Sequence, residues 1–122
     1  MISDLLKYYK VGSVKVKQKS MKDHAHFNVD TGTLELSTRY KTIKNRQIQE
    51  FLVTIIHEIY HAMDAKRYGW RKFKKMYEME MNYRISHGQH EYKDNKFEIK
   101  AEEFGQKNWQ RWYKKFKKNK IF

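Results

Sequence analysis

The feature that most constrains this chain is a long helical pattern from Asn45 to Tyr68, where apolar residues recur at helical spacing. The apolar stripe consists of Ile48, Leu52, Ile55, Ile56, Ile59, Ala62 and Met63. The same segment contains His57-Glu58-Ile59-Tyr60-His61, an H-E-x-x-H sequence. At about 100° per residue, both histidines fall roughly opposite the stripe. We therefore expect the helix to bury one face in the core and to present the two imidazoles from the other.

Two histidines four residues apart project from one side of a helix, so both imidazoles can reach a single ion. Glu58 points to the neighbouring side, where its carboxylate can hold a water molecule without binding the metal. Two neutral imidazoles with a further carboxylate suit zinc, which in catalytic sites keeps one position open. The alternative is a pair of exposed histidines on an amphipathic helix, without a metal.

A second motif, Glu98 to Gly105, opens another helical pattern and reads Glu-Ile-Lys-Ala-Glu-Glu-Phe-Gly. With H-E-x-x-H it resembles the gluzincin metallopeptidases, in which a later helix supplies a glutamate in the pattern E-x-x-A-D-x-F-A/G. The resemblance covers residues 45–106 and implies that Glu98 is the third metal ligand. It also implies that Glu102 replaces the aspartate that supports a ligating histidine.

Two other residues remain alternatives for the third ligand. Glu102 lies one helical turn after Glu98, so both carboxylates share a face. His87 lies in His87-Gly88-Gln89-His90, which resembles the H-G-x-x-F/W segment of SprT-like metalloproteins, with His90 at the aromatic position. Side chains near the glutamate helix are also candidates to stabilise a developing oxyanion. These candidates are Tyr83, His87, His90 and Tyr92.

The whole chain, residues 1–122, is predicted to be a single α+β domain of zincin-like type. Segments 14–17, 26–29 and 33–37 alternate at period two and predict a small antiparallel sheet of about three strands. Helices are expected at 3–10, 45–68 and 70–85, and from Lys96 to the end. In the zincins an edge strand of the sheet pairs with extended substrate, and the resemblance suggests Leu34 to Arg39 for that role.

Several classes of protein are disfavoured by composition. The chain has no cysteine, which rules out disulfides and cysteine-based zinc sites and fits a reducing compartment. Its first residues do not read as a secretory signal, and no run approaches the ~18 apolar residues of a membrane span. We therefore expect a cytoplasmic protein with no membrane partner.

The net charge is +13, and no acidic residue follows Glu103. A basic, aromatic helix is expected over about residues 106–122, and basic residues interleaved with aromatics can bind nucleic acid or an acidic protein. The basic residues concerned are Lys107, Arg111, Lys114, Lys115, Lys117, Lys118 and Lys120. The alternative is a solvated lysine-rich face over packed aromatics.

Two functions follow from these features. The first is a zinc-dependent metallopeptidase that acts on protein or peptide, with Glu58 as the general base. The second is a nucleic-acid-binding or regulatory protein, as in bacteria or phages, on a zincin-like scaffold without protease activity. A structural phage component is a third possibility.

Overall fold

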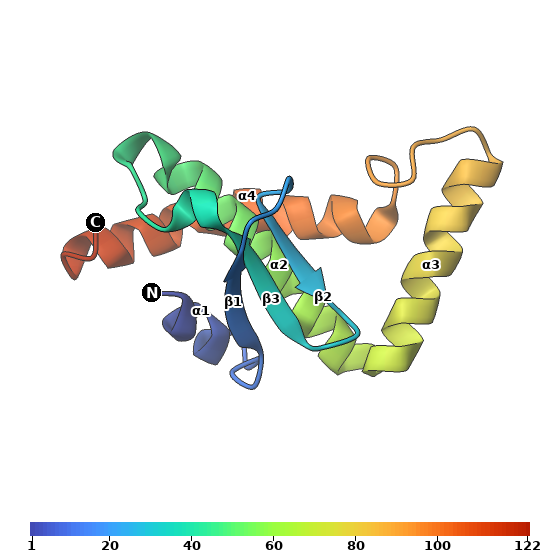
Figure 1. Ribbon diagram of the computed structural model, residues 1–122, viewed down its shortest axis with the longest axis horizontal. Helices are drawn as coiled ribbons and strands as arrows, with labels where there is room; N and C mark the ends of the chain where they lie inside the picture. Colours follow the sequence, from blue (N-terminus) through green and yellow to red (C-terminus); the bar gives the residue numbers. More distant parts are fainter.

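The computed structural model describes all residues from 1 to 122 and has an α+β fold (Figure 1). Three short strands and four α-helices follow one another in the order α1, β1, β2, β3, α2, α3, α4. The helices are α1 (Ile2–Tyr8), α2 (Ile48–Tyr68), α3 (Trp70–Ser86) and α4 (Lys96–Lys118). The strands are β1 (Lys15–Lys19), β2 (Ala25–Asn28) and β3 (Thr33–Ser37). Two 3-10 turns, η1 (Thr38–Tyr40) and η2 (Asn45–Gln47), connect β3 to α2.

Helix α2 runs through the centre of the molecule, with the sheet on one side and α4 on the other (Figure 1). Its apolar stripe is buried as predicted, and Leu52, Ile55 and Ile59 are fully covered. The opposite face carries His57 and His61 as predicted, and α4 packs along it and buries both. The alternative of two exposed histidines is therefore wrong. Gly69, with φ of +89°, ends α2 and allows the chain to turn into α3.

The sheet is mixed, which corrects the antiparallel arrangement predicted from the sequence. Its strand order is β1-β3-β2, with β1 parallel to β3 and β2 antiparallel to β3. A tight turn joins β2 to β3, and the Gly32 N–H donates a hydrogen bond to the Asn28 carbonyl in it. β3 occupies the centre because its Leu34 and Leu36 are buried, whereas all five residues of lysine-rich β1 are exposed. An exposed, charged strand is suited to an edge.

This topology also corrects the strand expected to meet an extended substrate. β3, which contains most of the predicted segment 34–39, is bonded on both edges and has no free peptide groups for another chain. The free edge that lies beside α2 and nearest α3 belongs to β2 (Figure 1). β1 and β2 are the two edge strands, and β2 is the one that packs against α2.

Helix α4 begins at Asn95, whose side-chain oxygen accepts a hydrogen bond from the Phe97 amide and caps the helix. It then packs along α2, and the two helices come closest where Gly105 faces Val53. A β-carbon at position 105 would lie 2.7 Å from the Val53 carbonyl oxygen, which is closer than such atoms approach. The absence of a side chain at Gly105 therefore allows α4 to lie against α2.

We predict that Gly105→Ala lowers the free energy of unfolding by about 1–3 kcal/mol, the usual cost of overpacking a close contact. Alanine in a helix interior otherwise stabilises relative to glycine, so the sign of the change is informative. Urea denaturation followed by circular dichroism measures it. Gly12→Ala is the matched control, because nothing lies within 4 Å of its β-carbon position. Equal stability of the two variants would contradict the close packing of α2 and α4.

The C-terminal half of α4 packs its aromatic residues inward. Trp112 and Phe116 are buried, and Trp112 donates a hydrogen bond from its indole N–H to the Tyr9 hydroxyl of the segment after α1. The basic residues predicted for this helix are all exposed: Lys107, Arg111, Lys114, Lys115, Lys117, Lys118 and Lys120. None of the helices is long and apolar enough to cross a membrane.

Candidate metal centre

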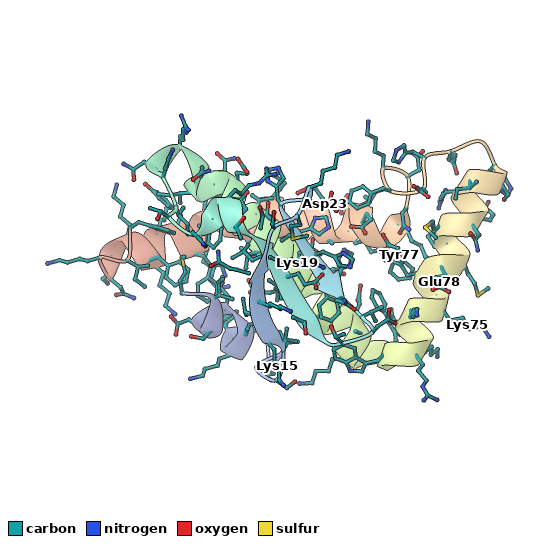
Figure 2. The ribbon with its side chains drawn as sticks, in the orientation of Figure 1. Lys15, Lys19, Asp23, Lys75, Tyr77 and Glu78 are labelled. Atoms are coloured by element: carbon teal, nitrogen blue, oxygen red, sulfur yellow. The ribbon has the colours of Figure 1, made fainter.

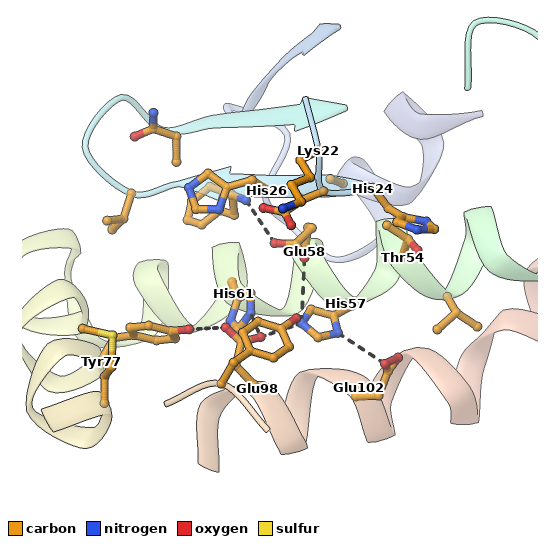
Figure 3. Close-up of a pocket in the computed structure, with 18 of the residues that line it drawn as sticks. Lys22, His24, His26, Thr54, His57, Glu58, His61, Tyr77, Glu98 and Glu102 are labelled. Atoms are coloured by element: carbon orange, nitrogen blue, oxygen red, sulfur yellow. Dashed lines mark hydrogen bonds and ion pairs between the residues drawn. The ribbon is translucent and has the colours of Figure 1, made fainter. Parts of the chain in front are cut away.

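Helices α2 and α4 bring three predicted residues together in the interior. His57 Nε2 lies 2.7 Å from Glu98 Oε1, and His61 Nε2 lies 2.9 Å from the same oxygen. All three side chains are buried. The two histidines share a face because they are one helical turn apart on α2, and Glu98 reaches them from the first turn of α4 (Figure 3).

Glu98 is held as a carboxylate by its neighbours. Burial acts to raise the pKa of Glu98, but the hydrogen bonds from the two histidines outweigh it and hold that pKa well below its usual range. Burial acts to lower the pKa of His57, and the bond to Glu98 with the nearby Glu58 charge raises it overall. Negative charge is thus concentrated at the point where both imidazole nitrogens converge.

Tyr77 of α3 completes the surroundings of Glu98. Its hydroxyl donates a hydrogen bond to Glu98 Oε2, which leaves Oε1 directed at the two histidines (Figure 3). Burial, followed by this hydrogen bond, raises the pKa of Tyr77, so the hydroxyl stays protonated. Helical spacing in the sequence does not reveal this role of Tyr77, because it does not distinguish a packed ring from one that also directs its hydroxyl at a neighbouring carboxylate.

Glu58 lies on the other side of the histidines, below strand β2. Its Oε1 accepts a hydrogen bond of 3.0 Å from the Phe27 amide, and its Oε2 lies 3.8 Å from His57 Nε2. The side chain is buried, and that burial raises the pKa of Glu58. The carboxyl group therefore faces the three candidate ligands without belonging to them.

The residues present fit a metal ion. One ligand atom from each of His57, His61 and Glu98 lies within 4.8 Å of the other two, and each atom is a nitrogen or oxygen donor. Two imidazoles and one carboxylate form a three-ligand set that leaves room for a further ligand. These three residues could hold a metal ion.

No family model, curated protein or solved structure matches this chain. The candidate metal centre is therefore interpreted from its own geometry.

Glu102, the predicted support for a ligand histidine, places its Oε2 3.8 Å from His57 Nδ1 and is half-exposed. His61 Nδ1, by contrast, is buried without a protein partner. Support from a carboxylate thus reaches one of the two histidines.

His87, the alternative ligand, lies outside this cluster. It is exposed at the end of α3, where its Nδ1 is 2.8 Å from the Tyr83 carbonyl oxygen and its ring packs on the Tyr83 ring. His90 Nδ1 accepts backbone amides of the following loop instead of facing the centre. Of the four predicted oxyanion donors, Tyr92 alone lines the same cavity as Glu98.

The cluster opens into a cleft of about 1140 Å³ between β2, α2, α3 and α4. Strand β2 forms its upper wall, and the sequence did not predict that His24, His26 and the Phe27 amide would lie there. The start of β2 is fixed to α2 because His24 Nδ1 lies 2.7 Å from Glu50 Oε1. The Tyr40 hydroxyl donates to the same carboxylate. These contacts fix the position of the β2 edge relative to the three candidate ligands on α2 and α4.

Proposed function

We propose that this chain is a zinc-dependent metallopeptidase. The observation that carries the proposal is the position of Glu58, a buried carboxylate between a three-ligand centre and a strand edge. A simple structural zinc site needs neither a non-ligating carboxylate beside it nor an open cleft. Structural sites also close their coordination with a fourth protein ligand. Two histidines with one glutamate are the ligand set of a catalytic zinc site.

A peptide substrate would lie along β2. The Phe27 amide points away from β3, since it donates to Glu58. Peptide groups alternate between the two sides of a strand, so the N–H and C=O of Ala25 and the C=O of Phe27 also face the cleft. Backbone pairing at such an edge holds an extended peptide without regard to its sequence.

The chain's own residues then perform the proton transfers. A bound zinc ion would supply Lewis-acid chemistry, lowering the pKa of water toward ~7 and polarising a carbonyl group. Glu58 accepts a proton from the attacking water and passes it to the leaving nitrogen. The raised pKa of Glu58 suits this exchange, because the residue must hold the proton between the two steps. Tyr92, on the cleft wall, is the predicted donor to the developing oxyanion.

The experiment that tests the proposal is hydrolysis of an unfolded protein by the purified, zinc-loaded chain. Activity should disappear on chelation and return when zinc is restored, because the three ligands would hold the ion reversibly. Metal analysis of the same preparation should give one zinc per chain. Stoichiometric zinc without cleavage of any protein would instead support a scaffold that uses its metal for stability.

The second candidate is binding to nucleic acid or another acidic partner through the C-terminal helix. The exposure of seven basic residues between Lys107 and Lys120 favours it. Base stacking by Trp112 or Phe116 does not, because both rings are buried in the core. A binding surface here would therefore contact phosphates, and would do so without marked sequence preference.

Replacing those seven residues with glutamine is expected to weaken nucleic-acid binding and to flatten its dependence on salt, since each phosphate contact releases counterions. The zinc content should stay unchanged, because α4 contributes Glu98 from its opposite end. Fluorescence anisotropy with a labelled duplex at several salt concentrations measures both quantities. Unchanged affinity and slope would identify the lysines as a solvated surface.

A further inference from the structure

The cleft has a charge opposite to that of the molecule around it. Seven of the 14 Asp and Glu residues line it, against three of the 27 Lys and Arg residues. A chain of net charge +13 thus gathers half of its carboxylates around one cavity. Glu98 is one of the three candidate ligands, Glu58 faces them and Glu102 lies beside His57. The remaining charges therefore determine what the two ends of the cleft attract.

The two ends differ. At the end near the start of β2, the carboxylates of Asp23 and Glu50 are balanced by Lys22 and Arg46. At the α3 end, Lys74 Nζ is already held by Asp30 Oδ1 at 2.7 Å. Glu78, one turn further along α3, is exposed and has no cation within ion-pair distance. Among the residues that line the α3 end, Asp30 and Glu78 therefore exceed Lys74 by one negative charge.

Aromatic rings lie next to this carboxylate. Tyr77 precedes Glu78 on α3, and both lie across the cleft from β2 (Figure 2). Phe73 and Tyr92 line the same cavity. A carboxylate that shares a cleft with aromatic rings can bind an ammonium or guanidinium group, because both attract a cation. The methylene stem of such a side chain also packs well against rings.

We propose that the α3 end of the cleft is a specificity subsite for a lysine or arginine side chain of the substrate, with Glu78 as its carboxylate. The inference rests on the proposed peptidase function. The side chains of an extended peptide paired with β2 point alternately to the two faces of the sheet. A side chain on one side of the reacting bond would therefore point toward α3. The balanced charges at the other end provide no such selection.

Peptide binding to the zinc-loaded Glu58→Gln protein tests this without cleavage. Two peptides of equal length that differ at one position, with lysine in one and glutamine in the other and no other charged group, are compared by anisotropy at physiological salt. We expect the lysine peptide to bind about fivefold more tightly, the size of a solvent-accessible ion pair, for positions on one side only. Adding Glu78→Gln should abolish the difference. Adding Glu103→Gln, an exposed α4 carboxylate outside the cleft, should preserve it.

The same peptides offered to the wild-type protein separate the two proposals. Selective binding that depends on Glu78, in a protein that cleaves nothing, would retain the subsite and overturn the peptidase. Cleavage with no preference for lysine or arginine would retain the peptidase and overturn the subsite. Equal loss of selectivity in the Glu78→Gln and Glu103→Gln proteins would also overturn it, because net charge alone would then explain the preference.

Discussion

Glu98→Ala is expected to leave the purified protein without stoichiometric zinc. The Glu98 carboxylate is the point on which both histidine Nε2 atoms converge, and it is the only carboxylate within ligand distance of both. Its removal takes away one of three ligands and the negative charge that favours a cation. Zinc titration with a competing chelator measures the loss. It should exceed the about 10- to 100-fold typical of residues that support a ligand without binding metal.

Two neighbouring residues provide controls for that result. Glu102→Ala should cost only about 10- to 100-fold in zinc affinity, because its carboxylate faces His57 Nδ1 at 3.8 Å and not the ligand cluster. His87→Ala should change nothing, since His87 is exposed at the end of α3. Circular dichroism confirms that each variant is folded. Loss of zinc in the His87→Ala or Glu102→Ala protein, with zinc retained in Glu98→Ala, would mean that the third ligand is misassigned.

Glu58→Gln is expected to keep zinc and to lose hydrolytic activity by about 100-fold or more, the range that general-base catalysis contributes. Glutamine preserves the shape of the side chain and can still accept the Phe27 amide hydrogen bond. It cannot take a proton from water. The substitution therefore removes proton transfer and leaves the local structure intact. Metal content reports on the structure of the site, and turnover measured on the same sample reports on proton transfer.

Glu103→Gln is the matched control for Glu58→Gln, because it removes one carboxylate from an exposed position of α4 outside the cleft. Both variants carry the same change in net charge. Activity that survives in Glu58→Gln at the level of Glu103→Gln would exclude the proposed general base. Loss of zinc from Glu58→Gln would show that Glu58 acts as a ligand.

The positions of the helices and of the metal cluster were predictable because the signals are local. The 3.6-residue period of residues 45–68 predicted α2, and the last helix was expected from Lys96, where α4 begins. The four-residue spacing of His57 and His61 requires no tertiary information. The pairing with Glu98 came from the resemblance of a second motif, and the close approach of α4 to α2 brings that carboxylate to both histidines.

The features that the sequence left undetermined all depend on contacts between segments distant in the chain. Strand patterns predicted three strands, but their order depends on packing between distant segments. β3, with Leu34 and Leu36 buried, became central, and β1 and β2 became the edges. The burial of His57 and His61 depends on α4, which covers the face of α2 that carries them, and the period of α2 alone does not reveal this.

The surroundings of the metal centre were decided in the same way. Tyr77 reaches Glu98 and the Phe27 amide reaches Glu58 only because α3 and β2 are packed beside α2. Half of the carboxylates lie around one cleft, and the strongly basic composition of the chain does not predict this. Residue spacing determines which side chains share one face of a helix. Packing between helices and strands determines which side chains and peptide groups of other segments contact that face.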